Sequence, residues 1–244
     1  FGTLAVQGTA SEPVTFTSLK DDSVGGDANN DLGATTPAPG DWGSILVDGG
    51  SVTLTHAVLR FGGSGAFAGT FLIANLVVEG GTASVADSRL EQAGIHNVRL
   101  TAGSLAIART EIAAASSGNG VLIDGGTAVI GQSSIRDNRG FGVFAATGTL
   151  DLASTTSTRN FGAVFLDASV RFTHRDNQAF GNIRNGFQIE GTFIEDTAWT
   201  ADNPPYLTFS TSTLAISAGH ILTLGPGVVV KFGSQSAHLR VFGT

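Results

Sequence analysis

The sequence contains no cysteine and no methionine. Without cysteine the chain can form neither a disulfide nor a thiolate metal site, and it has no thiol nucleophile. The lack of both sulfur-containing residues suits a long-lived protein outside the cell, because these side chains are the most easily oxidised. We therefore expect an extracellular location.

Charged residues are also scarce, at 14% of the chain, and the formal net charge is −7. The basic residues are scattered, and Lys20 and Lys231 are the only lysines, so nucleic acid is not expected as a partner. No apolar run approaches the roughly 18 residues of a membrane helix. The chain does not start with methionine or with a signal peptide, which indicates a mature or excised piece.

A short apolar segment that begins at glycine or asparagine recurs along the chain. Its later copies start 22, 20 and 24 residues apart (142 − 120, 162 − 142 and 186 − 162). Such a period, with glycine corners and alternating β-branched residues, predicts an all-β parallel β-helix with three strands per coil and about ten coils. The segments are GSILVDGG from Gly43, NVRLTAGS from Asn97, GVLIDGGT from Gly120, GVFAATGT from Gly142, GAVFLDAS from Gly162 and GFQIEGTF from Gly186.

Asparagines and phenylalanines have predicted places in these coils. Five asparagines come just before leading strands, where a turn tolerates them, and they could bond amide to amide along the axis. Sixteen phenylalanines against one tyrosine favour dry aromatic stacks in the core. The asparagines are Asn97, Asn119, Asn138, Asn160 and Asn185.

A long acidic loop insertion is predicted over residues 19–41. Asp27, Asn29 and Asp31 stand at alternate positions, as do the first oxygen ligands for Ca²⁺ in an EF-hand loop. The segment differs from that motif because Leu32 replaces the sixth-position glycine and no glutamate stands at position twelve. The loop is therefore a candidate for structural Ca²⁺, the alternative being a solvated acidic loop, and no other cofactor is expected. The candidate ligands are Asp21, Asp22, Asp27, Asn29 and Asp31.

The two ends of the chain carry a family resemblance. The segment TLAISAGHILTLGPGVVVKF at 213–232, and the segment from GTLAVQGT to PGDWGSI within residues 2–47, resemble bacterial right-handed parallel β-helix surface proteins of the pectate-lyase-like solenoid type. The resemblance implies a right-handed β-helix on a bacterial cell surface. In that family the PGVVVKF coil directly precedes the GTLAVQGT coil, whereas here the two lie at opposite ends.

Phe-Gly-Thr occurs at both termini, at residues 1–3 and 242–244, an offset of 241 residues (242 − 1). We expect residues 1–244 to form one β-helix domain with uncapped ends, equivalent to one super-repeat of about 241 residues. Open strand edges would then pair with a neighbouring copy or repeat. The predicted end-to-end interface consists of Phe1, Gly2, Thr3, Leu4, Val6, Leu239, Val241, Phe242, Gly243 and Thr244.

The predicted function is a non-catalytic structural repeat of a bacterial extracellular filament, stalk or giant surface protein. Two alternatives remain open: a polysaccharide-acting β-helix enzyme, and a carbohydrate-binding adhesin or tailspike-like module that contacts cell-surface polysaccharide. Hydrolysis needs two carboxylates across a glycosidic bond; an ice-binding face needs a regular threonine array, which the sequence does not suggest. The available carboxylates are Asp124, Asp151, Asp167, Glu190, Glu195 and Asp196, and the five histidines have unrelated local contexts.

Overall fold

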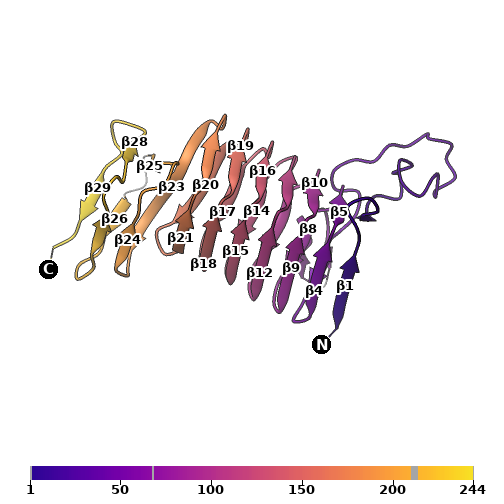
Figure 1. Cartoon of the computed structure of the whole chain (residues 1–244), viewed down its shortest axis with the longest axis horizontal. Coiled ribbons are helices and arrows are strands. Elements are labelled where there is room, and N and C mark those ends of the chain that lie inside the picture. Colours follow the sequence, from indigo (N-terminus) through magenta and orange to yellow (C-terminus); the bar gives the residue numbers. More distant parts are fainter. Residues whose placement is uncertain (1, 68, 210–213, 244) are drawn as a thin grey trace.

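In the computed structural model the chain winds into a parallel β-solenoid, whose strands lie side by side along one long axis (Figure 1). The structure describes residues 2–67, 69–209 and 214–243, and this part of the chain contains strands and no helix. The two termini lie at opposite ends of the axis (Figure 1). The predicted all-β parallel fold is confirmed.

Three parallel sheets form the sides of the solenoid, and each regular turn adds one strand to each sheet. Sheet A contains β1 (Thr3–Gln7), β4 (Ser51–Thr55), β9 (Thr82–Ala86), β12 (Ser104–Ala108), β15 (Thr127–Gly131), β18 (Thr149–Ala153) and β21 (Arg171–Arg175). Sheet B contains β2 (Val14–Phe16), β5 (Ala57–Arg60), β10 (Arg89–Glu91), β13 (Glu111–Ala113), β16 (Ser134–Arg136), β19 (Thr156–Thr158) and β22 (Gln178–Phe180). Sheet C contains, in axial order, β3 (Ile45–Val47), β8 (Ala74–Val78), β11 (His96–Leu100), β14 (Val121–Ile123), β17 (Phe141–Ala145), β20 (Gly162–Asp167), β23 (Arg184–Phe193), β25 (Tyr206–Thr208) and β28 (Val230–Phe232).

The C-terminal section departs from this plan. There β24 (Thr197–Trp199) pairs with β27 (Leu222–Leu224), and β26 (Leu214–Ile216) lies between the end of β23 and β29 (Leu239–Val241). A small antiparallel hairpin, β6 (Ala66–Phe67) with β7 (Thr70–Phe71), also lies outside the three sheets. Sheets A and B therefore have seven strands each, and the solenoid has about seven regular turns. The prediction of about ten was too high because it assigned a coil to every 20–24 residues, including the long loop and the irregular C-terminal section.

The corners between sheets A and B are made by residues in the left-handed backbone region. Their φ values lie between 47° and 55°. Such angles are disfavoured for residues with a side chain, but the next turn holds each one: the N–H of Asp87 donates to Ala108 O and that of Arg109 to Gly131 O. Each regular turn therefore has three strands, as predicted, and the strands of sheets A and B meet at this corner. The corner residues are His56, Asp87, Arg109, Gln132, Ser154 and Asp176.

Five of the six corners between sheets C and A contain glycine, and the corner from Asp167 to Val170 does not. Gly103 has φ 85°, and a Cβ there would lie 2.4 Å from the carbonyl oxygen of Gly81 in the turn below. Because successive corners stack this closely, a larger residue would push the turns apart. This explains the glycine corners that follow the short apolar segments in the sequence.

The core is filled mainly by aliphatic side chains, with one row from each sheet pointing inward. Leu90, Ile112 and Ile135 of sheet B, for example, are completely buried. The prediction of phenylalanine stacks in the core is wrong for the middle turns: Val143 points inward, whereas Phe144 and Phe165 stack on the outer face of sheet C, 4.4 Å between ring centroids. The Val and Ala side chains of β17 face the core. Because side chains alternate between the two faces of a strand, the phenylalanine between them faces outward.

A ladder of buried asparagine amides runs along the corner before sheet C. Each Nδ2 donates to the Oδ1 of the next asparagine at 3.0–3.1 Å. Four of the five predicted asparagines belong to this ladder; Asn119 does not, because its Oδ1 accepts the N–H of Phe141 instead. The side-chain amides of the ladder also donate to buried backbone carbonyl groups, among them those of Glu91 and Ala113. Its members are Asn75, Asn97, Asn138, Asn160, Asn182 and Asn185.

Asn160→Ala should strongly destabilise the solenoid. The change leaves the N–H of Asn138 and the carbonyl of Ile135 without the partners they have now, and each buried unpaired group costs about 1–3 kcal/mol. We expect the free energy of unfolding, measured by urea titration with circular dichroism, to fall by about 3 kcal/mol. Asn203→Ala, at an exposed position, is the matched control and should change it by less than about 0.5 kcal/mol. Equal effects of the two substitutions would contradict the structural role of the ladder.

Candidate functional site

The acidic loop leaves the solenoid after β2 and returns at β3, and it projects from the N-terminal end (Figure 1). Its base is fixed by Asp21, whose side chain lies 2.5 Å from Arg60 Nη2 and accepts hydrogen bonds from the hydroxyls of Ser23 and Thr17. Burial alone would raise the pKa of Asp21, but these hydrogen bonds and the arginine charge lower it below its usual value. Asp21 is therefore an anchor of the loop and lies outside the group of carboxylates that converge, Asp22, Asp27 and Asp31; its role as a metal ligand stays a prediction.

The other end of the loop is held by Asp41 and Trp42. Asp41 pairs with Lys20 at 2.8 Å and accepts the Ser18 hydroxyl at 2.7 Å. The indole of Trp42 donates to Arg60 O at 2.8 Å. A Cβ on Gly62 would lie 2.9 Å from the indole ring, so the ring packs directly on this backbone. The loop is thus tied to the first turns at both of its ends.

Between these anchors, three carboxylates converge. Oxygen atoms of Asp22, Asp27 and Asp31 lie within 4.8 Å of one another. The Asp27 oxygens accept the N–H groups of Asp31 and Leu32 at 3.1 and 2.9 Å. Asn29 joins the group, because its Nδ2 donates to Asp31 Oδ2 at 2.8 Å. Four of the five predicted ligands are therefore brought together.

Two oxygens of this cluster, Asp22 Oδ1 and Asn29 Oδ1, are fully buried and have no hydrogen-bond partner among the residues that the structure describes. Burial, together with the negative charges of Asp27, Asp31 and Asp21, raises the pKa of Asp22. A cation would reduce the repulsion between the carboxylates and would give the two unpaired oxygens a partner. Because all the donors are oxygen atoms, the site suits Ca²⁺. Calcium binding remains a prediction, now assigned to Asp22, Asp27, Asp31 and Asn29.

The carboxylates considered for an enzyme have other partners. Glu195 and Asp196 line a hollow of about 390 Å³, but Arg171 binds Glu195 through two bonds of 2.8 and 3.0 Å. These bonds lower the pKa of Glu195, which makes it unsuited to act as the protonated general acid. Asp167 and Glu190 are neighbours in adjacent strands of sheet C. Asp167 accepts the hydroxyl of Ser169 at 2.6 Å, and Glu190 accepts the side-chain amide of Gln188 at 2.7 Å.

Two histidines that look unremarkable in the sequence are buried. His96 accepts the N–H of Asn119 through Nδ1 at 2.9 Å, and burial lowers its pKa to about 4, so its ring is neutral. His174 lies between Asp202 Oδ2 at 3.1 Å and the Tyr206 hydroxyl at 2.5 Å. This second group joins the end of sheet A to the C-terminal section. The sequence gives no local signal for it, because its members are 28 and 32 residues apart.

The outer face of sheet A carries a row of hydroxyl residues that the sequence analysis missed. The register of the strands places Ser51, Thr82, Ser104, Thr127 and Thr149 in line on successive turns. The expectation in the sequence concerned a regular array of threonine alone. Serine stands at Ser51 and Ser104, so threonine does not occur on every turn of this row.

The two ends of the solenoid expose strand edges. Among the described residues, β1, β2 and β3 pair on one side only at the N-terminal end, as do β27, β28 and β29 at the C-terminal end. Large apolar side chains are exposed there, with Leu4 at 40% and Val241 at 70%. Leu239 and Phe242 are also exposed, but the Val6 side chain is buried, so this residue can contribute only backbone. Phe1 and Thr244 lie outside the described residues.

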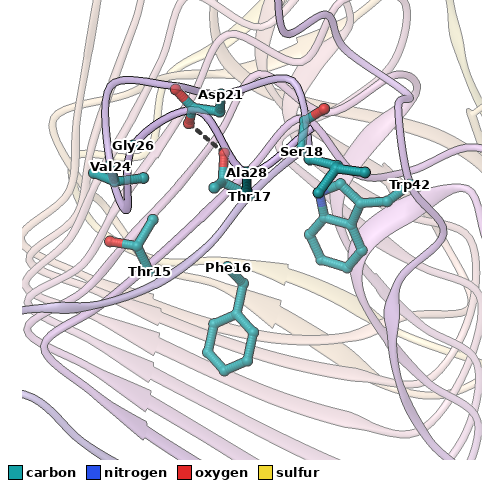
Figure 2. A pocket seen from close by; sticks show the side chains of 10 residues that line it. Thr15, Phe16, Thr17, Ser18, Asp21, Val24, Gly26, Ala28 and Trp42 are labelled. Atoms are coloured by element: carbon teal, nitrogen blue, oxygen red, sulfur yellow. Dashed lines mark hydrogen bonds between the residues drawn. The ribbon is translucent and has the colours of Figure 1, made fainter. Parts of the chain in front are cut away.

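Two hollows open over the first turn. One, of about 480 Å³, lies beneath the acidic loop; Figure 2 shows Phe16 below the segment that carries Asp21 and Val24, with Trp42 at the side. The other, of about 390 Å³, is bounded by Gly2–Leu4, residues 45–48 and residues 50–52. The N-terminal end is thus a concave surface with unpaired strand edges.

No protein-family model, curated protein sequence or solved structure matches the chain. The likeness to bacterial β-helix surface proteins accordingly remains a resemblance of motifs. The described residues include no helix long and apolar enough to span a membrane. The acidic loop and the two ends of the solenoid are therefore the features that bear on its function.

Calcium should stabilise the protein if the loop cluster binds it. A ligand present at about a hundred times its Kd adds about 2.7 kcal/mol, so the melting temperature should rise by several degrees in Ca²⁺ relative to chelator. Asp22→Asn should abolish this rise while leaving the melting temperature in chelator unchanged or higher, because it relieves repulsion. Glu12→Gln, an exposed acid outside the loop, should leave the rise intact. If the unmodified protein melts at the same temperature in Ca²⁺ and in chelator, the prediction that the loop binds calcium is wrong.

Proposed function

We propose that the protein is a non-catalytic structural segment of an extracellular filament, stalk or large surface protein of a bacterium, stacked end to end with copies of itself or with adjacent repeats. The observation that carries this proposal is the pair of open ends. The last strands, β27, β28 and β29, run parallel to their neighbours and have a free edge, as have β1, β2 and β3 at the N-terminal end, so the C-terminal end of one unit can offer strand edges to the N-terminal end of another. Such a head-to-tail contact does not close on itself and builds a linear assembly.

Exposure at the C-terminal end supports the same function. Leu224, Val229 and Phe232 are each about half exposed and lie on or beside the last strands. Soluble monomers rarely leave contiguous apolar surface of this kind uncovered. A following coil would cover these side chains and pair the free N–H and C=O groups at once.

The rigid body of the solenoid suits a mechanical role. Stacked turns are joined by backbone pairing along the axis and by an uninterrupted core from Val6 to Ile216. Nine strands follow one another in sheet C, and at about 4.8 Å each they give an axial length near 43 Å. The acidic loop extends past β1 at the N-terminal end, on one side of the solenoid (Figure 1).

Association of the purified chain tests the proposal. Light scattering should show a mass that rises with protein concentration, and electron micrographs should show linear particles with an axial repeat of about 43 Å. Because the contact joins strand edges, no other component should be needed. A monomer at all concentrations, with no linear particles, would contradict the stacking function.

A further inference from the structure

Only one of the three sheets runs the whole length of the solenoid. Sheet A ends at β21 and sheet B ends at β22, whereas sheet C continues from β20 through β23 to β25 and β28. Among the described residues, no backbone-to-backbone hydrogen bond joins residues 191–243 to residues 2–183. The C-terminal section, which begins with β23, is therefore joined to the regular turns by backbone pairing along one side only.

The sequence accounts for this interruption at two places. After β24 the chain passes through Pro204 and Pro205 directly into β25, so no strand follows β22 in sheet B. A proline could not donate to a neighbouring strand there, because it has no N–H group. Strand β23 leaves sheet C at Gly191: it pairs with β20 up to Glu190 and with β26 from Gly191 onward. Glycine suits this bend because the φ of Gly191 is 104°.

An open slot lies between β21 and β24. Both strands line a hollow of about 390 Å³, but they do not pair with each other. The N–H of Arg171 and the C=O of Arg175 bond to the turn that contains β18. The backbone groups of the alternate residues, Phe172 and His174, therefore point into the slot. The His174 side chain is 4% exposed, whereas the residue as a whole is only partly buried, so its exposed surface belongs to the backbone.

Side chains, and not strand pairing, hold the two walls of the slot together. On its outer rim Arg171 binds Glu195 through two bonds of 2.8 and 3.0 Å, and these side chains are 71% and 59% exposed. On the inner side Asp202 lies 3.1 Å from His174 Nδ1 and accepts the N–H of Asn177 at 3.1 Å. An exposed ion pair holds weakly, whereas the Asp202 side chain is only 3% exposed.

We propose that the solenoid has a hinge at this slot. The C-terminal section tilts about sheet C, which stays paired, and the slot between β21 and β24 widens. Two latches hold it closed: the exposed pair of Arg171 with Glu195, and the buried group around Asp202. The hinge lies within one copy of the chain, so it does not depend on the stacking function. In a stacked filament it would add one bending point to each copy.

Distances between spin labels test the hinge, because the chain has no cysteine of its own and takes labels only at engineered sites. Ala106→Cys/Thr223→Cys places the labels on β12 and β27, on either side of the slot. Thr53→Cys/Thr173→Cys is the matched control, whose labels lie five strand spacings apart within sheet A, about 24 Å. We expect the distance distribution from pulsed electron paramagnetic resonance to be about twice as broad across the slot as in the control.

Removal of the latches should open the slot further. Asp202→Ala should shift the distances across the slot to longer values, because it removes the buried contacts. Glu195→Ala should broaden the distribution without such a shift, because the pair that it removes is exposed. Glu12→Ala, at an exposed position in the first turn, should change neither. The control pair should keep its narrow distribution in every variant, which shows that the regular turns stay folded.

The outcomes separate the hinge from its latches. A distribution across the slot that is as narrow as the control, in the unmodified protein and in both latch variants, overturns the hinge. A broad distribution that neither substitution changes supports the hinge and overturns the two latches. The labelled protein is diluted with unlabelled protein, so that only distances within one copy are measured and end-to-end association does not affect the result.

Discussion

In a parallel solenoid, the backbone N–H and C=O groups of each coil pair with those of the coils on either side. The last coil at each end therefore has one unpaired strand edge. In this protein the constraint is visible at each level, since the corner N–H groups, the strand ladders and the asparagine amides all find their partners one turn away. Backbone groups removed from water without a partner are costly. The stack therefore stabilises its middle turns well and its two ends poorly, and the function proposed for the protein follows from this difference.

The corners show how the stack overrides local preference. Gln132 and Arg109 adopt a left-handed backbone that neither residue prefers. Five residue types occur at these six positions and only aspartate occurs twice, so the bend between sheets A and B could not be predicted from the sequence. The corner between sheets C and A could, because a Cβ at Gly103 would collide with the turn below and only glycine fits.

The acidic loop was partly predictable. Its position and the alternation of Asp27, Asn29 and Asp31 are evident in the sequence, but adjacent aspartates cannot be told apart there. In the structure Arg60, 39 residues further along the chain (60 − 21), holds Asp21, while Asp22 faces the cluster. Likewise, Phe144 lies outside the core because its neighbours in β17 point inward, and only the register of the strands decides which of two adjacent apolar residues does so.

The central claim is that the free strand edges at the ends are where copies meet. Hydrogen–deuterium exchange over a wide range of protein concentration tests it directly. Amides of β1, β3, β28 and β29 should exchange rapidly in dilute solution and become protected as concentration rises, while those of the middle turns stay protected throughout. Exchange at these edge strands that does not depend on concentration would contradict the account.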